Sequence, residues 1–200
     1  MGDTPSIKRI CVFCGSRRGA RPEYTATARQ LGKVMVSQGI GLVYGGGSIG
    51  LMREIADAVL REKGEVIGVI PHALVSKEFA HAGLTELRVV SSMHERKAMM
   101  AELSDAFIAM PGGFGTFDEL FEILTWAQLG LHTKPIGLLN TDGYFDLLLA
   151  FIQHVLKERF IQTKHRRLIM TSHDPEKLLA EIIRCTPPAK IPRLIDWKET

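Results

Sequence analysis

The sequence predicts an α/β protein with a parallel β-sheet and helices on both faces of that sheet. Short apolar runs alternate with helical patterns along almost the whole chain, as in proteins whose parallel strands are joined by crossover helices. The runs are nearly all apolar, which is typical of strands that are buried on both faces. The 200 residues suit one hydrophobic core, so we expect a single domain from residue 1 to residue 200.

The expected strands and helices follow from these patterns in chain order. Strands are expected at Arg9 to Phe13, Gly41 to Tyr44, Val66 to Ile70, Leu87 to Val90, Ala106 to Met110 and Ile136 to Leu139, a number typical of Rossmann-like sheets. Helices are expected from about Glu23 to Gly39 and at Ile49 to Lys63, Met93 to Leu103, Thr116 to Leu131, Tyr144 to Lys157 and Pro175 to Arg184. Pro22 suits a first helical turn. Residues 1–6 and 186–200 are expected to be irregular tails.

The helix expected at Tyr144 to Lys157 is unusually apolar. Little polar surface is left by Leu147, Leu148, Leu149, Phe151, Ile152, Val155 and Leu156. Such a helix should be buried on more than one side. Either it lies deep within its own domain, or part of it lies in a homodimer interface.

The composition excludes several classes of protein. Hydrophobic residues make up 46% and charged residues 24% of the chain, as in ordinary folded domains. A net charge of +3 with scattered basic residues gives little support for a nucleic-acid surface. No apolar run approaches the roughly 18 residues of a membrane span, and the first residues do not resemble a signal peptide. We expect a cytoplasmic protein with neither nucleic-acid nor membrane partners.

Two of the three cysteines form a CxxC pattern at the first strand. Cys11 lies within that strand and Cys14 directly follows it, so strand alternation points their sulfur atoms to opposite faces. This arrangement disfavours a shared metal or a redox pair. We interpret the two side chains as small buried hydrophobes and expect neither a metal nor a cofactor.

Three glycine-rich turns each follow a strand and precede a helix. They are Cys14-Gly15-Ser16, Gly45-Gly46-Gly47-Ser48-Ile49-Gly50 and Pro111-Gly112-Gly113-Phe114-Gly115-Thr116. All three should lie at the carboxyl edge of the sheet, where ligands bind in open α/β folds and helix N-termini suit a phosphate. Any one of them alone could be no more than a tight turn. Together they favour a phosphate site.

The glycine spacing alone would also suit a dinucleotide or a nucleoside triphosphate, but the surrounding residues disfavour both. Gly45, Gly47 and Gly50 fit GxGxxG, but the next strand ends at Gly68-Val69-Ile70-Pro71 without the acidic residue that a dinucleotide motif requires. The chain contains no GxxxxGK[ST] motif for a triphosphate. A nucleoside monophosphate fits better than either.

Two sets of charged residues stand at unusual positions. Met93, Arg96, Lys97 and Met100 share one helical stripe, so the two cations either extend past apolar neighbours into water or face an anionic ligand. Glu119 lies off the apolar stripe of its helix. It either completes a capping box that begins at Thr116 or faces the crevice above the third glycine turn.

The third turn carries a family resemblance. The segment Pro111-Gly112-Gly113-Phe114-Gly115-Thr116-Phe117-Asp118-Glu119 resembles the PGGxGTxxE motif of the LOG ("Lonely Guy") family of cytokinin riboside 5′-monophosphate phosphoribohydrolases. The resemblance extends over nearly the whole chain, through Cys11-Val12-Phe13-Cys14-Gly15-Ser16, Val43-Tyr44-Gly45-Gly46-Gly47, His94-Glu95-Arg96-Lys97 and Thr125-Trp126-Ala127-Gln128-Leu129-Gly130. Asp118 replaces the Glu of many relatives.

The resemblance implies roles for individual residues. Arg96 and Glu119 would be the catalytic pair, the segment from Gly113 to Glu119 would wrap the phosphate and ribose, and Glu78, Lys97 and Thr125 would help to bind substrate. It also implies a homodimer. With the glycine turns, the candidate substrate-binding residues are Gly15, Ser16, Gly45, Gly46, Gly47, Glu78, Lys97, Gly112, Gly113, Phe114, Gly115, Thr116, Phe117, Asp118 and Thr125.

The function implied is hydrolysis of the N-glycosidic bond of adenosine 5′-monophosphate or an N6-substituted form, which yields free base and ribose 5-phosphate. A carboxylate such as Glu119 would stabilise positive charge on the sugar or activate water, and Arg96 would orient Glu119 or the leaving base. Two alternatives stay open: a general purine monophosphate nucleosidase, and a nucleotide-binding or carrier protein without turnover. The older label of such sequences, lysine decarboxylase, has no support, because no lysine stands in a recognisable pyridoxal-phosphate setting.

Overall fold

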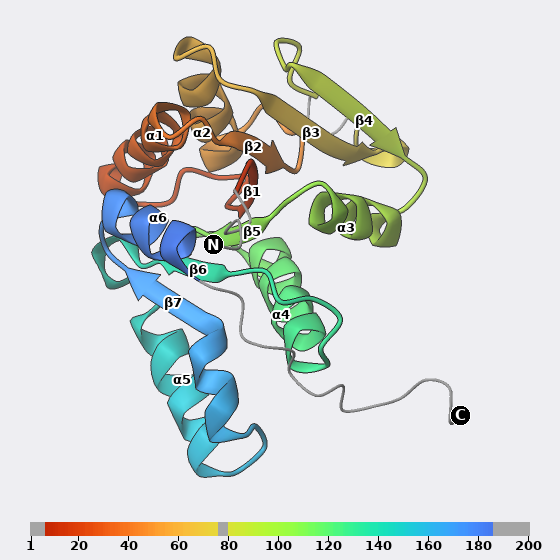
Figure 1. Cartoon of the computed structure of the whole chain (residues 1–200). Coiled ribbons are helices and arrows are strands. Elements are labelled where there is room, and N and C mark those ends of the chain that lie inside the picture. The colour runs from red at the N-terminus through yellow and green to blue at the C-terminus, as the bar shows by residue number, and fades with distance from the viewer. Residues whose placement is uncertain (1–6, 76–79, 186–200) are drawn as a thin grey trace, which may run out of the picture.

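A computed structural model describes residues 7–75 and 80–185 of the chain, which form a seven-stranded sheet (Figure 1). The strands are β1 (Arg9–Phe13), β2 (Gly41–Tyr44), β3 (Val66–Pro71), β4 (Glu86–Val90), β5 (Ala106–Ala109), β6 (Ile136–Leu139) and β7 (Ile169–Ser172). Their order is β4-β3-β2-β1-β5-β6-β7, and every neighbouring pair is parallel. The predicted α/β class is therefore confirmed.

Helices cover both faces of the sheet, as predicted (Figure 1). One face packs on α1 (Pro22–Ser37), α2 (Gly50–Arg61) and α6 (Pro175–Arg184), and the other on α3 (Met93–Glu102), α4 (Phe114–Gln128) and α5 (Asp146–Lys157). Short 3₁₀ turns occupy His72–Leu74, Thr141–Gly143 and Thr163–Leu168. The two faces bury separate hydrophobic clusters. Cys11 belongs to one cluster and Cys14 to the other, so the predicted opposite orientation of their side chains is confirmed.

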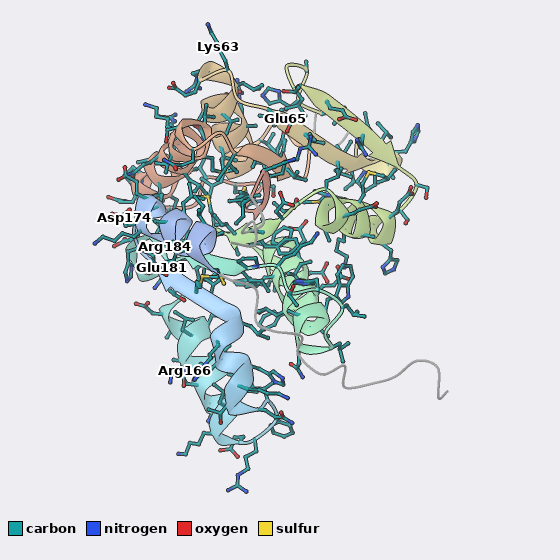
Figure 2. All side chains as sticks on the ribbon, viewed as in Figure 1. Lys63, Glu65, Arg166, Asp174, Glu181 and Arg184 are labelled. Carbon is teal, nitrogen blue, oxygen red and sulfur yellow. The ribbon has the colours of Figure 1, made fainter. Side chains whose placement is uncertain are left out.

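The start and the outer face of α6 have the residue types expected of a surface helix. Asp174 caps the helix, because its carboxylate accepts hydrogen bonds from the N–H groups of Glu176 (2.8 Å) and Lys177 (3.2 Å). Glu181 and Arg184 extend from the outer side of the helix (Figure 2), whereas Leu178, Leu179 and Ile182 are buried against the sheet. This pattern is the amphipathic one expected for a surface helix.

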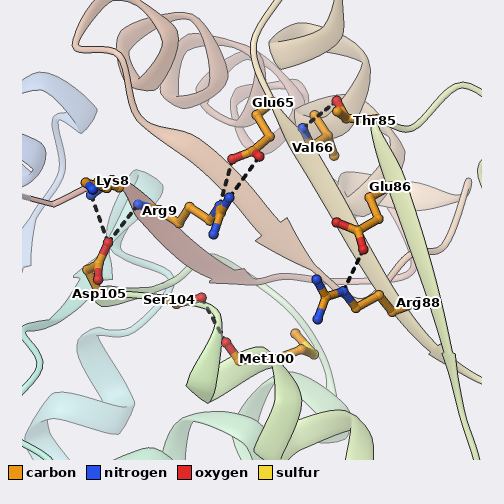
Figure 3. Close-up of polar contacts among 10 residues, drawn as sticks. All are labelled: Lys8, Arg9, Glu65, Val66, Thr85, Glu86, Arg88, Met100, Ser104 and Asp105. Atoms are coloured by element: carbon orange, nitrogen blue, oxygen red, sulfur yellow. Dashed lines mark hydrogen bonds and ion pairs between the residues drawn. The ribbon is translucent and has the colours of Figure 1, made fainter.

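The amino edge of the sheet is held by ion pairs and side-chain hydrogen bonds (Figure 3). Asp105, just before β5, accepts hydrogen bonds from the backbone N–H groups of Lys8 (2.8 Å) and Arg9 (3.0 Å). The Arg9 guanidinium binds both carboxylate oxygens of Glu65, at 2.7 and 3.0 Å. These contacts join the starts of β1, β3 and β5 and leave the opposite, carboxyl edge for the glycine turns.

Two sequence-based expectations about α4 and the sheet are wrong. The helix expected to begin at Thr116 begins at Phe114, with Gly113 as its N-cap and no side-chain cap, so Thr116 and Glu119 do not form a capping box. The strand β7 was not expected at all. Three of its residues are half-buried and one, Thr171, is exposed, because β7 lies at the edge of the sheet and carries no continuous apolar run.

The apolar helix expected from Tyr144 is not buried within its own chain. It begins at Asp146, and none of its residues is fully buried. Leu147 is 86% and Phe151 60% exposed, and Phe160, just beyond the helix, is 83% exposed. The alternative of a helix deep in its own domain is therefore wrong. Among the described residues, no helix is long and apolar enough to cross a membrane.

Candidate active site

A cavity of about 230 Å³ opens at the carboxyl edge of the sheet beside β1 and β5. The strand order reverses between these two neighbours, and such a switch point is where open α/β sheets bind ligands. The wall of this cavity is formed by Val12, Cys14, Gly15, Ser16, Gly45, Met52, Leu74, Met93, Arg96, Gly113, Phe114, Gly115, Thr116, Asp118 and Glu119. All three predicted glycine turns thus contribute to one site.

The first and third glycine turns are bound directly to each other. The N–H of Gly15 donates to the carbonyl of Pro111 at 3.0 Å. A Cβ atom at Gly112 would lie 2.0 Å from Oγ1 of Thr116, so a larger residue would force the turn away from the helix that follows it. Glycine is therefore required there by close packing, and Gly112 does not line this cavity.

The N-terminus of α4 faces the same cavity. Gly113 caps the helix without a side-chain hydrogen bond, so N–H groups of the first turn are free of the usual cap. Cβ atoms at Gly113 and Gly115 would meet no atom within 4 Å, which shows that the space beside this turn is open. Open N–H groups at the positive end of a helix are suited to a phosphate.

Arg96 is almost fully buried in the cavity wall. Its side chain comes from the second turn of α3, the residue is 5% exposed, and Nη2 donates to the carbonyl of Gly45 at 3.2 Å. Nε is buried without a hydrogen-bond partner among the described residues. A buried guanidinium held by a neutral carbonyl is costly unless an anion approaches it. The alternative in which Arg96 extends into water is wrong, and the site favours an anionic partner.

Glu119 lies on the wall of the same cavity, on the second turn of α4. The residue is half-buried. Its charge also acts on the strand beneath: burial, and to a smaller extent the Glu119 carboxylate, raises the pKa of the Cys11 and Cys14 thiols well above the ordinary range. Because the helix begins at Phe114, the position of Glu119 is not explained by helix capping.

Lys97 does not line the cavity and is bound to carboxylates instead. Its Nζ lies 3.1 Å from Oδ2 of Asp118 and 3.1 Å from Oε1 of Glu122, and its side chain is 11% exposed. Burial lowers the pKa of Lys97, but the hydrogen bonds to Glu122 and Asp118 outweigh burial and raise it overall. The lysine thus joins α3 to α4 next to the cavity, and the chain itself supplies the anions that it faces.

Several further candidates do not form the wall of the cavity. Gly46 and Gly47 contact the segment after β3: the carbonyl of Gly46 accepts from the N–H of His81, and Gly47 pairs with Ala80. Phe117 packs edge-on against Phe145. Exposed Thr125 donates to the Phe121 carbonyl at 2.7 Å. Glu78, like both expected tails, lies outside the described residues.

Some wall residues were not predicted from the sequence. Met52 on α2 and Leu74 after β3 give the cavity an apolar side. A second cavity of about 320 Å³ shares Gly15, Ser16 and Gly113 with the first and includes Arg17, Arg18, Tyr24 and Tyr144 in its wall. The Tyr144 hydroxyl donates to the carbonyl of Gly112. The sequence signals for this second cavity were the first and third glycine turns and the arginines that follow β1.

Comparison with known proteins identifies relatives across this whole region. A family model described as possible lysine decarboxylase matches residues 52–182. The probable cytokinin riboside 5′-monophosphate phosphoribohydrolase LOGL9 of Oryza sativa subsp. japonica is 51% identical over 181 residues, which cover 90% of this chain and 80% of that protein. The cytokinin riboside 5′-monophosphate phosphoribohydrolase LOG7 of Arabidopsis thaliana is 48% identical over 188 residues, or 94% of this chain and 87% of that protein.

The chain belongs to the LOG family. The resemblance to this family is therefore confirmed, and it extends from the third glycine turn to most of the chain. Solved structures of similar shape include the molybdenum cofactor binding protein of Rippkaea orientalis, with a TM-score of 0.66 at 24% identity over 88% of this chain and 94% of that one. The molybdenum cofactor carrier protein of Chlamydomonas reinhardtii gives a TM-score of 0.64 at 22% identity over 86% and 98% of the two chains. At these identities the likeness extends to the fold alone.

Proposed function

We propose that this LOG-family protein hydrolyses the N-glycosidic bond of adenosine 5′-monophosphate or its N6-substituted forms, giving free base and ribose 5-phosphate. One observation carries the proposal. The cavity at the switch point combines the open N-terminus of α4 with a buried guanidinium, Arg96, and a carboxylate, Glu119, on one wall. A phosphate anchor and a charged pair within one small cavity suit cleavage of a phosphorylated sugar.

The phosphate is assigned to the glycine turns. Gly15 and Ser16 would contact it from the loop after β1, and Gly113, Phe114 and Gly115 from the first turn of α4, whose N–H groups favour an anion. Binding energy at this remote end would hold the ribose with C1′ near the charged pair. The cavity of about 230 Å³ is smaller than the roughly 300–1,000 Å³ of most small-molecule sites, so part of the substrate would extend beyond it.

The reaction requires charge stabilisation more than covalent participation. As the C1′–N bond breaks, positive charge develops on the sugar, and water adds its oxygen to C1′ while the base leaves with a proton. The Glu119 carboxylate would stabilise that charge or accept the proton of the water. Arg96 would orient Glu119 or bind the leaving base, and its burial keeps the guanidinium fixed in a poorly hydrated wall.

The remaining candidates would act at the edge of the site. Gly45 and Asp118 lie in the wall, and Gly45 borders the guanidinium directly. Outside the wall, Gly46, Gly47, Gly112 and Phe117 would support the glycine turns and the first turns of α4. Lys97 would act on substrate through its ion pair with Asp118. We retain Glu78 and Thr125 as proposed substrate contacts.

The description of the matching family suggests a different enzyme, a lysine decarboxylase. That chemistry commonly uses pyridoxal phosphate held by a lysine as a Schiff base. Within residues 7–75 and 80–185, no lysine stands in the wall of the switch-point cavity, and the nearby Lys97 is held by two carboxylates. The residues of this site do not fit pyridoxal phosphate.

We also infer that the protein is a homodimer that acts in the cytoplasm. The exposed apolar side chains Leu147, Phe151 and Phe160 form a surface that water disfavours, and a second copy of the chain is the partner we propose for it. The buried thiols of Cys11 and Cys14, which form no disulfide, are suited to a reducing compartment.

Incubation with a panel of nucleoside monophosphates, followed by chromatography of the bases, tests the proposed reaction. We expect adenine or N6-substituted adenine to appear together with ribose 5-phosphate. A carrier protein would instead bind the nucleotide, as measured by equilibrium dialysis, and release no base. A general purine nucleosidase would cleave guanosine and adenosine monophosphates at similar rates.

A further inference from the structure

A buried carboxylate, Glu54, lies outside the cavity wall and joins two arginines. It stands on α2, is 3% exposed, and uses both of its oxygens. Oε1 is 2.8 Å from Nη2 of Arg18, and Oε2 is 2.8 Å from Nε of Arg29. Arg18 belongs to the loop between β1 and α1, and Arg29 to α1. One carboxylate therefore connects α1, α2 and the loop that carries Gly15 and Ser16.

That loop lies directly against the start of α2. The N–H of Leu51 donates to the carbonyl of Gly15 at 2.9 Å. A Cβ atom at Gly50 would lie 2.2 Å from the carbonyl carbon of Ser16 and 2.4 Å from the N atom of Arg17. Backbone contacts thus hold the start of the loop at Gly15 and Ser16. The ion pair between Arg18 and Glu54 holds the same loop at a second point, three residues after Gly15.

Stability alone is a weak explanation for this arrangement. Burying a carboxylate is costly, and the attraction of its partners often does no more than offset that cost. The side chains of Arg18 and Arg29 are 64% and 49% exposed, so water weakens both ion pairs. The arrangement of Glu54 between Arg18 and Arg29 is better suited to holding the loop in one conformation than to stabilising the fold.

We propose that Glu54 is a positioning residue that acts through Arg18 to hold the Ser16 loop in the conformation that binds the substrate phosphate. This inference rests on the proposed function in one respect, the assignment of the phosphate to Ser16 and Gly15. The loop lies at the phosphate end and not at C1′. A looser loop would weaken the binding of the substrate and of the transition state equally, which raises KM and leaves kcat unchanged.

Glu54→Gln tests the proposal, because glutamine has the same shape and lacks the charge. We expect KM for the monophosphate to rise roughly tenfold, equivalent to about 1.4 kcal/mol, while kcat stays within about twofold of wild type. Arg18→Gln should give the same result. The double variant should be no worse than either single one, since both remove the same interaction.

Arg29→Gln is the matched control. It breaks the other ion pair of the same carboxylate and leaves the loop attached through Arg18. Its melting temperature is expected to fall as in Glu54→Gln, with KM unchanged. Equal increases in KM for Arg29→Gln and Glu54→Gln would overturn the proposal, because the carboxylate would then act through general stability.

Hydrogen exchange supplies a second measurement that does not depend on catalysis. Amides at residues 15–20 should exchange faster in Glu54→Gln than in wild type or in Arg29→Gln. If wild type releases no base from any monophosphate, the proposed function fails, and this comparison alone decides the role of Glu54. If the amides at residues 15–20 exchange at the wild-type rate in Glu54→Gln, the proposed role of Glu54 is overturned.

Discussion

A methyl group at Gly45 should displace the guanidinium of Arg96 without altering any charged group. A Cβ atom there would lie 2.1 Å from Nη2 and 3.2 Å from Cζ of Arg96, and 3.3 Å from Sδ of Met52. Unstrained heavy-atom contacts begin near 3.5 Å, so Nη2 must retreat by about 1.4 Å. The retreat breaks the hydrogen bond to the Gly45 carbonyl and shifts Arg96 relative to Glu119. A misplacement of about 1 Å can reduce rate on the order of 100-fold, and we expect that loss of kcat/KM in Gly45→Ala.

Gly64→Ala is the matched control for this clash. A Cβ atom at Gly64 would lie 2.4 Å from Cγ2 of Val36 and 2.7 Å from Cγ1 of Val59. Gly64 precedes β3 and lies at the end of the sheet opposite the site; its sequence neighbours Lys63 and Glu65 are labelled in Figure 2. Steady-state base release and thermal melting should be measured for both variants. Gly64→Ala should melt earlier and retain its kcat/KM, whereas a Gly45→Ala protein with wild-type kcat/KM would refute the importance of the position of Arg96.

Two further predictions concern Glu119 and the apolar surface. Glu119→Gln should melt near the wild-type temperature, because glutamine keeps the size of the side chain and can still form hydrogen bonds while it lacks the charge. Its kcat should fall roughly 10²–10⁴-fold, as for an acid–base group; unchanged kcat with unchanged melting would remove Glu119 from the catalytic pair. By light scattering, wild type should have twice the 22.2 kDa mass of one chain. The double substitution Leu147→Ser and Phe151→Ser should convert it to a folded monomer. A wild-type mass near 22.2 kDa on dilution would contradict the dimer.

The sequence predicted the centre of the sheet better than its margin. Strands β1, β2 and β6 have the expected bounds, because strands buried on both faces form continuous apolar runs. The edge strand β7 has one exposed residue, Thr171, and no fully buried one, so it lacked that signal. The start of α4 was placed too late, because Gly115 disfavours a helix by local propensity, although it lies in the first turn of α4.

The site could be predicted only in part from local spacing. Arg96 stands in a helical stripe with apolar neighbours and Glu119 lies off the stripe of its helix, but the family resemblance was what implied a catalytic pair. Both residues lie in the wall of one cavity. The partners of Lys97 could not be predicted, since Asp118 and Glu122 lie on another helix. The pairing of Glu54 with two arginines from different elements was hidden for the same reason.

The most direct test of the proposed function compares adenosine 5′-monophosphate with adenosine. Free adenine and ribose 5-phosphate should be quantified together over time at equal enzyme concentration. If the glycine turns anchor a phosphate and the pair Arg96 and Glu119 cleaves at C1′, the monophosphate will yield both products in equal amounts, and adenosine will yield almost no adenine. Equal rates of adenine release from the two substrates, or no release from either, would contradict this function.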